Sequence, residues 1–273
     1  MIGKHGNRAS TSRSGSADLL ACVQPKPPQI SAITPSTIHQ VFSHTNYAFL
    51  FAPIFHPGAR HAATIRKQLG WRTIFNLLGP LANPLHPLIE ARMIGVARKE
   101  IGPDFAESLR QAGCRKAMVV CGDEELDEVS CAGPTHCWRL MENLNTNQVD
   151  IQYFTLEPKD FGLPSHSLSD VSPGQSPEAN AEILMRILKG EVPEDDPILH
   201  FVYINTAALF AVSGICDADT SNMGHGDDGN VIKESGPGGG RWKEGVRRAK
   251  WAISSGEAYK QWVEFVQITN KVA

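Results

Sequence analysis

The pattern of apolar and polar segments predicts an α/β fold, with a central, mostly parallel or mixed sheet flanked by helices. Short apolar runs that suit buried strands, such as KAMVVC at residues 116–121, occur beside amphipathic runs that suit helices, such as NAEILMRIL at residues 180–188. Strands that alternate with helices along a chain are typical of a sheet covered by helices. This rhythm is clearest from residue 92 onward.

The composition allows a sizeable core and excludes some classes of protein. Of the 273 residues, 41% are hydrophobic and 20% are charged, close to an ordinary globular protein. The formal net charge of -3 argues against a general nucleic-acid binder, so an anion must be bound at a local site. The six cysteines form no CxxC pair, and no run approaches the roughly 18 apolar residues of a membrane helix. We expect a soluble, cytoplasmic protein with free thiols.

The N-terminal part is expected to contain a loop, two short helices and one strand. Residues 3–16 are rich in Gly, Ser and Thr, which indicates a loop. A short helix is expected at residues 18–23, and a second one through Ile38 and Phe42 after a Pro-Ser-Thr start signal. The apolar run YAFLFAP at residues 47–53 suits a strand or a buried segment.

The next segment is expected to change from helix to extended chain to turn. A helix is expected from His56 to Gly70, followed by an extended apolar run at residues 72–78. The sequence GPLANP at residues 79–84 predicts a turn-rich loop, because glycine, proline and asparagine all favour turns.

The remaining chain predicts alternating elements and one irregular insertion. The polar, glycine-rich residues 217–241 are expected to form a surface insertion or a flexible loop. The expected strands are 92–96, 116–121, 138–141 and 151–156, and the expected helices are 104–112, 180–188, 200–214 and 242–266 with a break at Gly256.

The first segment that carries chemistry is residues 4–18, which combine glycines, hydroxyls and cations. Gly6 and Gly15 let backbone amides approach a ligand closely, and the helix that follows would point its N-terminus at an anion. Lys4 and Arg8 supply positive charge. The residues alone leave two interpretations open, a cradle for a phosphate group and a disordered basic terminus.

The second such segment is residues 56–84, which contain three arginines. Arg66 lies within the expected helix, and a guanidinium group recognises a carboxylate with two parallel hydrogen bonds. With Phe75 and Pro80 nearby in the sequence, it would suit an aromatic acid. A solvated surface arginine is the other interpretation.

The third segment, DEELDEVS at residues 123–130, follows the strand expected at residues 116–121. Adjacent carboxylates at the end of a strand are well placed for a hard divalent cation, which prefers oxygen ligands and keeps several waters. An acidic surface turn is the other interpretation.

Taken in this order, the three segments resemble the anthranilate phosphoribosyltransferase family of glycosyltransferases. The characteristic stretches are KHGNR followed by GSAD, then FLFAP…HP…R..LG.RT.FN.LGPL.NP, then LDE.S..GPT. The segments FGLP at 161–164 and NTAALFAVSG at 205–214 also fit, so the resemblance covers most of the chain.

The resemblance implies a small helical domain and a larger α/β domain, with the site between them. Residues 1–70 would hold the phosphate loop and helices that belong partly to the helical domain, of which only remnants are expected. Residues 71–273 would form the α/β phosphoribosyltransferase domain, with the insertion at 217–241.

The resemblance also implies residues for each ligand. Those implied for phosphoribosyl pyrophosphate share one loop and are Lys4, Gly6, Asn7, Arg8, Thr11 and Ser16. Those implied for anthranilate are His5, Asn7, Arg66, which would bind the carboxylate, and Pro80 in the pocket wall. Asp127 and Glu128 match the family's magnesium ligands.

The reaction implied is the transfer of a phosphoribosyl group to anthranilate in tryptophan biosynthesis, with Mg²⁺ as cofactor. An arylamine is a weak base that needs little deprotonation before it attacks, so no residue is assigned as a catalytic acid or base. No membrane or nucleic-acid partner is expected, and a homodimer is expected for the full-length family member.

The chain also departs from the family pattern. The GTGGD-type pyrophosphate loop and the Asn-x-Ser-Thr segment that precede KHGNR in the family are absent, so an N-terminally truncated member is expected. Two alternatives follow: a truncated or degenerate, non-catalytic relative, and an enzyme like the pyrimidine-nucleoside phosphorylases, which share the fold.

Overall fold

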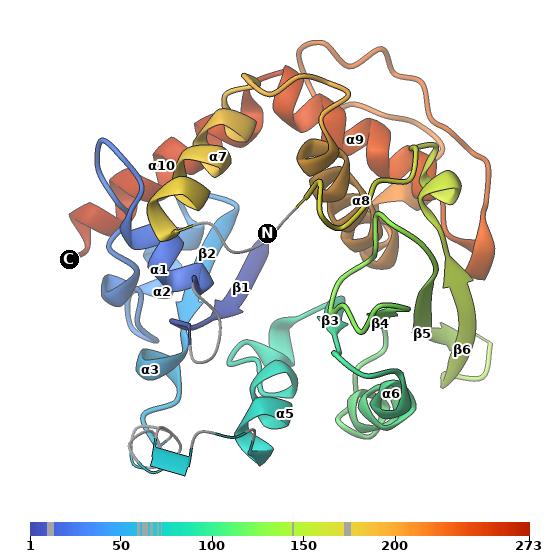
Figure 1. The fold of residues 1–273 in the computed structure, drawn as a ribbon, viewed down its shortest axis with the longest axis horizontal. Coiled ribbons are helices and arrows are strands. Elements are labelled where there is room, and N and C mark those ends of the chain that lie inside the picture. The colour runs from blue at the N-terminus through green and yellow to red at the C-terminus, as the bar shows by residue number, and fades with distance from the viewer. Residues whose placement is uncertain are drawn as a thin grey trace. The chain divides into compact units, whose positions relative to one another are not determined.

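The computed structural model describes residues 1–9, 14–58, 61, 65, 68–69, 71, 73–143, 145–171 and 176–273. The chain divides into two compact units, each assembled from separate segments. Unit 1 comprises Met1–His86, Ser172–Val192 and Gly256–Ala273, and unit 2 comprises Pro87–Val171 and Pro193–Ser255. Both units combine strands with helices, which confirms the α/β class (Figure 1).

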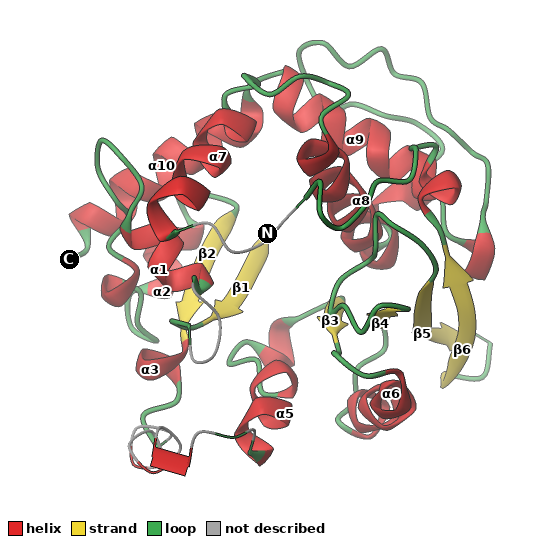
Figure 2. Ribbon diagram, in the orientation of Figure 1, coloured by secondary structure: helices red, strands yellow, loops and turns green. Residues whose placement is uncertain are grey.

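Unit 1 is built around a two-stranded parallel sheet of β1 (Ile2–Gly6) and β2 (Tyr47–Phe51), seen side by side in Figure 2. The middle of β2 is fully buried, as expected for an apolar strand that is covered on both faces. The helices of this unit are α1 (Ser16–Ala21), α2 (Ile38–Phe42), α3 (Ala52–Phe55), α5 (Ile74–Leu81), α7 (Pro177–Leu188) and α10 (Glu257–Lys271). Phe49 and Leu50 of β2 form one core with Val41 of α2 and Phe265 of α10.

The prediction of a loop at residues 3–16 was wrong at its beginning, because residues 2–6 form β1. The parallel register pairs Lys4 with Phe49 and His5 with Leu50. The buried strand β2 offers backbone hydrogen-bonding groups along its edge, and pairing with them overrides the loop-like composition of the segment.

Two further predictions were wrong in part, because residues 74–81 form helix α5. The helix replaces most of the extended run predicted at 72–78 and the start of the turn predicted at 79–84. A short apolar run does not distinguish a strand from a helix, and leucine favours helices. Pro80 lies within the helix near its C-terminal end. The helix expected from His56 to Gly70 falls largely outside the described residues, although His61, Ile65, Gln68 and Leu69 are helical.

Unit 2 contains a four-stranded sheet in the order β3 (Arg92–Gly95), β4 (Ala117–Gly122), β5 (Thr135–Asn143) and β6 (Gln148–Leu156). The pair β3–β4 is parallel, whereas β4–β5 and β5–β6 are antiparallel, so the sheet is mixed. Every residue of β4 is buried, as expected of an internal strand with an unbroken apolar sequence.

Helices pack on both faces of this sheet. Trp138 of β5 contacts Gly102 at the start of α6 (Gly102–Gln111), where a larger side chain would collide with the indole. The next residue, Arg139, donates to the carbonyl of Ala211 in α8 (Pro197–Ser213). Since consecutive strand residues point to opposite faces, α6 and α8 lie on opposite sides of the sheet. Helix α9 (Trp242–Ser254) packs against α8.

The predicted strands and helices from residue 92 onward are confirmed, with boundaries moved by a few residues. Residues 217–241 contain one 3-10 turn (Pro237–Gly239), the last residue of another (Ile215–Asp217) and no α-helix or strand, and they pack on α9. The 3-10 turns of the chain are Ile30–Ala32, His86–Leu88, Lys99–Ile101, Pro158–Phe161, Ile215–Asp217 and Pro237–Gly239.

The division into units differs from the expected boundary at residue 70, since unit 1 continues to His86 and takes two later segments. The assignment of residues 1–70 to parts of a helical domain stays a prediction. Among the helices of the described residues, none combines the length and apolar character needed to cross a membrane.

Candidate functional site

The basic segment of unit 1 leaves β1 and returns into α1. Lys4 is exposed on β1, and the amide of Ala17 in α1 donates to the carbonyl of Asn7 at 3.2 Å. A Cβ atom on Gly15 would collide with the backbone at Ala9, so glycine is required for this close approach. The described residues on the two sides of the segment, 7–9 and 15–17, are therefore held close together between a strand and a helix.

The carboxylate of Asp18 holds both ends of this loop. Its Oδ2 accepts hydrogen bonds from the amides of Ala9 at 2.8 Å and Gly15 at 3.1 Å. Its Oδ1 lies 3.7 Å from the guanidinium of Arg8, whose side chain is 68% exposed. Asp18 therefore sets the shape of the loop, while the cation of Arg8 stays accessible to a ligand.

Five of the six residues predicted for a phosphate-bearing ligand are brought together here. A Cβ atom on Gly6 would lie 2.6 Å from Ser16 Oγ, so these two residues are neighbours. Asn7 is exposed, and its Oδ1 accepts from the amide of Arg8 at 2.8 Å. Thr11, the sixth, lies outside the described residues.

Only some of the residues predicted to bind an aromatic acid lie among the described residues. His5 of β1 contacts His56, with ring centroids 4.9 Å apart and planes at 67°. Pro80 is exposed on α5, and its role in a pocket wall stays a prediction. Arg66 lies outside the described residues. His56 was not predicted as a site residue, although the His-Pro pair in the recognised stretch could have indicated it.

The acidic segment of unit 2 is a tight turn between β4 and β5. The amide of Gly122 donates to the carbonyl of Leu126 at 2.8 Å, and that of Asp123 donates to the carbonyl of Pro134 at 3.0 Å. Glu125 has a positive φ of 62°, which the tight turn requires. Asp127 and Glu128 are adjacent and exposed on the bend that follows.

The backbone after Asp127 is held by buried polar groups. Ser130 Oγ donates to Glu124 Oε1 at 2.6 Å and accepts from the amide of Ala132 at 3.0 Å. The amide of Ser130 donates to Thr135 Oγ1 at 2.8 Å. Ser130 and Thr135 are both fully buried, so the bond between them is protected from water.

The end of β3 approaches the acidic turn so closely that only glycine fits. A Cβ atom on Gly95 would collide with the carbonyl group of Asp127. The turn is therefore packed against the sheet at the residue that carries one of the two predicted metal ligands.

The carboxylates of Asp127 and Glu128 suit a hard divalent cation that also binds ligands from outside the protein. Asp127 and Glu128 offer two exposed carboxylates on a well-anchored backbone, the type of oxygen ligand that Mg²⁺ prefers. No group of three or more potential metal ligands occurs among the described residues. A cation held here would take its remaining ligands from water or from a phosphate group.

The cysteines near the acidic turn are unsuited to act as nucleophiles. Burial raises the pKa of the Cys121 and Cys131 thiols, and nearby acidic residues raise it further. Both thiols therefore stay protonated near neutral pH, whereas the thiolate is the reactive form.

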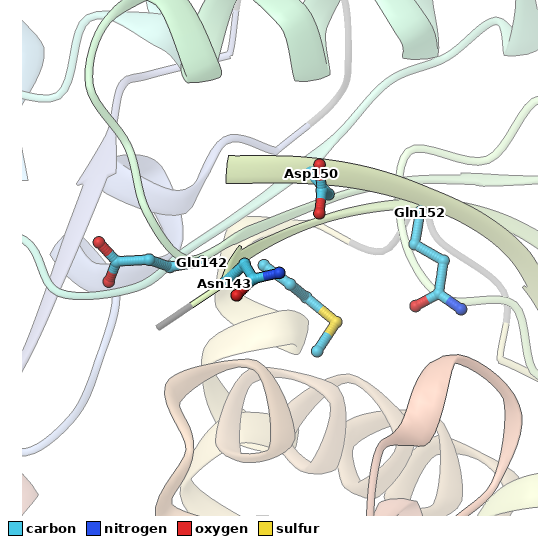
Figure 3. Close-up of a pocket in the computed structure, with 5 residues that line it drawn as sticks. Glu142, Asn143, Asp150 and Gln152 are labelled. Atoms are coloured by element: carbon cyan, nitrogen blue, oxygen red, sulfur yellow. The ribbon is translucent and has the colours of Figure 1, made fainter. Parts of the chain in front are cut away.

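A shallow depression on the β5–β6 hairpin carries none of the predicted residues (Figure 3). Its lining residues are Met141, Glu142, Asn143, Asp150 and Gln152. Two carboxylates with no cation in the lining do not suit an anionic substrate. The depression is therefore not taken as the candidate site.

The fold belongs to a class of glycosyl transferases. The model of the family described as "Glycosyl transferase family, a/b domain" matches residues 1–259. The anthranilate phosphoribosyltransferase of Schizosaccharomyces pombe is 39% identical over 271 residues, which cover 98% of this chain and 66% of the relative. That of Petrotoga mobilis is 34% identical over 270 residues, which cover 99% of this chain and 67% of the relative.

Solved structures give the same result. The Saccharomyces cerevisiae enzyme in complex with PRPP and Mg superposes with a TM-score of 0.81 at 31% identity, over 99% of this chain and 65% of that chain. Its complex with 4-fluoroanthranilate superposes with a TM-score of 0.78 at 30% identity, over 99% and 64%. The chain therefore belongs to the anthranilate phosphoribosyltransferase family, and it spans about two thirds of the length of these relatives.

Proposed function

We propose that the chain acts in the transfer of a phosphoribosyl group from 5-phosphoribosyl 1-pyrophosphate (PRPP) to anthranilate, giving N-(5-phosphoribosyl)anthranilate and pyrophosphate in tryptophan biosynthesis. The observation that carries this proposal is the pair of anchored segments, one cationic and one acidic, in a chain 39% identical to such an enzyme. We also propose a cytoplasmic location and, for the full-length protein, a homodimer.

The loop after β1 is proposed to bind PRPP. The ammonium of Lys4 and the guanidinium of Arg8 are exposed cations that suit its phosphate groups. Gly6 allows a close backbone approach, and the side chains of Asn7 and Ser16 can donate hydrogen bonds to phosphate oxygens. Thr11 is proposed for the same ligand.

Asp127 and Glu128 are proposed to hold Mg²⁺, which when bound neutralises the negative charge of the pyrophosphate leaving group. The protein's own part is to present two carboxylates from a backbone that hydrogen bonds and close packing hold in place. The bonds of Ser130 and the contact of Gly95 support this role, because a preorganised site loses little free energy in ordering its ligands.

Anthranilate is proposed to lie near His5 and Asn7, with Arg66 on its carboxylate and Pro80 in the pocket wall. The contact of His5 with His56 adds His56 to this set. In the reaction, the bond from ribose C1 to the pyrophosphate oxygen breaks and a bond from C1 to the aromatic nitrogen forms. The amine then loses a proton to solvent, so positioning is the main task of these side chains.

The proposal is tested by incubating the purified chain with PRPP, anthranilate and Mg²⁺, and measuring N-(5-phosphoribosyl)anthranilate by mass spectrometry. We expect product with Mg²⁺ and none with a chelator. The double variant Asp127→Ala/Glu128→Ala should lose more than about 100-fold in turnover, as when transition-state charge stabilisation is removed. The matched control is Asp123→Asn, which changes an exposed carboxylate of the same turn and keeps its hydrogen bond to His136.

Other outcomes separate the alternatives. Saturable binding of PRPP without product would favour a non-catalytic relative over the proposed activity. Phosphate-dependent cleavage of a pyrimidine nucleoside would favour the phosphorylase-like alternative. Turnover that is unchanged in the double variant would refute the metal assignment.

A further inference from the structure

The acidic turn is joined to helix α8 through one amide side chain, that of Asn205. Asn205 Oδ1 accepts a hydrogen bond from the amide of Val129 at 2.9 Å. Asn205 Nδ2 donates to the carbonyl of the same residue at 3.0 Å and to the carbonyl of Phe201 at 3.1 Å. One side chain therefore satisfies both backbone groups of Val129 and is itself tied to its own helix.

This arrangement requires the chemistry of a primary amide. The side chain has to accept one hydrogen bond and donate two, and asparagine does so with a carbonyl oxygen and an NH₂ group. A carboxylate would place a second acceptor against the carbonyl of Val129, and an apolar side chain would leave both backbone groups without these bonds. Val129 is fully buried, so the loss of either bond would leave a polar group desolvated.

The position of Val129 links this clamp to the predicted metal ligands. Val129 directly follows Glu128 and comes two residues after Asp127. Its amide is part of the peptide unit that begins at Glu128, so holding that amide limits the backbone rotation of Glu128. On the other side, Gly95 packs against the backbone of Asp127. The two carboxylates therefore extend from a segment that is held at both ends.

The helix that carries Asn205 is a firm support. Asp196 caps its N-terminus by accepting from the amide of Ile198 at 2.8 Å, and Gly214 ends it in the left-handed conformation with a φ of 87°. Tyr203, Ile204, Ala207 and Ala208 of the same helix are buried around Asn205.

We propose that Asn205 is a positioning residue for the divalent cation, which holds Asp127 and Glu128 in their metal-binding geometry through the backbone of Val129. Asn205 acts through these residues and does not itself touch the cation. This inference rests on the proposed function, because it takes Asp127 and Glu128 as the cation ligands.

The test uses Mn²⁺ in place of Mg²⁺, with and without PRPP, and three variants of the full chain. Asn205→Asp keeps the acceptor for the Val129 amide but replaces the donor, and Asn205→Ala removes both. The control is Ser213→Ala, which removes a side-chain bond to the Phe210 carbonyl on the same helix, about 12 Å farther along its axis. Paramagnetic resonance of free Mn²⁺ gives the affinity, and amide hydrogen exchange measured by NMR reports on Val129.

We expect the Mn²⁺ affinity to fall about tenfold or more in both Asn205 variants, as found when the support of a metal ligand is removed. The stoichiometry should stay as in the unmodified chain, because the ligands themselves remain. Exchange at Val129 should accelerate most in Asn205→Ala, which removes the acceptor of this amide, and stay slow in Ser213→Ala. If Asn205→Ala does not fold, Asn205→Asp carries the test.

Folded Asn205 variants that bind Mn²⁺ as tightly as the unmodified chain would overturn this inference and leave the proposed function standing. If the unmodified chain binds no Mn²⁺, even with PRPP, the proposed metal site is wrong. The role inferred for Asn205 then falls with it, because that role depends on the metal site. A loss of affinity in Ser213→Ala equal to that in Asn205→Asp would show a general effect of the helix and would also overturn it.

Discussion

Two acid-bearing segments of unit 2 differ in the groups that engage their carboxylates. The acidic turn at residues 123–130 is anchored mainly by neutral groups, among them the amide of Asn205 and the hydroxyl of Thr135. The glycine-rich residues 217–241 are anchored by carboxylates bound to arginines. Asp227 lies 3.0 Å from the guanidinium of Arg247, and the backbone amide of Ile232 donates to Glu244 of α9 at 2.9 Å.

Asp227 of the glycine-rich segment and Glu244 of the adjoining helix α9 are both engaged inside the fold. Glu244 has a fully buried side chain and accepts from Arg247 and Arg248, each at 2.8 Å. Burial alone would raise the pKa of Glu244, but the bonds from Arg247 and the amide of Ile232 hold it below the ordinary value. The pKa of Asp227 is also lowered, chiefly by the amide of Met223 and the hydroxyl of Ser221.

The comparison teaches how a chain keeps carboxylates accessible to a ligand. Where neutral amides and hydroxyls hold the backbone, Asp127 and Glu128 are left exposed at the surface. Where carboxylates do the anchoring, they are surrounded by donors and cannot also serve a cation. The number of acidic residues in a segment therefore does not by itself indicate a metal site.

The largest effect is expected from Glu244→Gln, which leaves Arg247 and Arg248 without their shared charged partner. Breaking a buried ion pair costs about 3–5 kcal/mol in the free energy of unfolding. Asp127→Asn, in the acidic turn, should change the free energy of unfolding by less than about 0.5 kcal/mol, since its side chain is exposed. Urea unfolding followed by fluorescence measures both, and equal losses in the two variants would contradict the comparison.

A smaller effect is expected from Gly95→Ala. The added methyl group collides with the carbonyl group of Asp127, so the acidic turn must shift away from the sheet. Overpacking of this kind costs about 1–3 kcal/mol of stability, and Mn²⁺ affinity should fall with it. The control is Gly133→Ala in the same connection, where the structure leaves open space for a methyl group. A Gly95→Ala variant with unchanged Mn²⁺ affinity would show that the turn tolerates displacement.

The smallest expected effect is a pH dependence of stability that comes from a pair of histidines, His166 and His200, beside the acidic turn. The amide of His166 donates to the carbonyl of Cys131, at the end of the acidic turn, and His166 Nε2 shares a hydrogen bond of 2.8 Å with His200 Nδ1. Burial lowers the pKa of His200, and the neighbouring His166 and Lys250 lower it further, against the opposing effects of the Glu194 backbone and Asp195.

Because the folded state disfavours the protonated form of His200, the unfolded chain binds more protons below the ordinary pKa of 6.5. Stability should therefore fall as the pH drops from about 7 to about 5, before the carboxylates of the glycine-rich segment titrate. In His200→Gln this fall should be shallower, as measured by thermal unfolding across that range. An identical pH dependence in the variant would exclude His200 as its source.

Several elements were predictable because their signals are local. The buried strand β4 follows from the apolar run AMVVC flanked by turn residues, and α8 follows from a long apolar segment that ends at a glycine. The acidic turn and the basic loop were identified from residue types and spacing, and all of their predicted residues except Thr11 lie among the described residues.

Other features depended on partners that are distant in the sequence. The strand β1 exists because β2, more than forty residues later, offers an edge to pair with. The partner of Asn205 is Val129, which precedes it by 76 residues, and no local pattern indicates that contact. The helix α5 was mistaken for an extended run, because the four apolar residues of 72–78 carry no decisive periodicity.

The sequence by itself determined the family, the α/β class and the segments that carry chemistry, since these depend on residue types in a fixed order. Only the tertiary structure decided which carboxylates are engaged by arginines and which stay exposed beside a held backbone. The physical reason is that the partners of Asp227 and Val129 are distant in the sequence and are brought close by packing, and charges and hydrogen bonds act over a few ångströms of space.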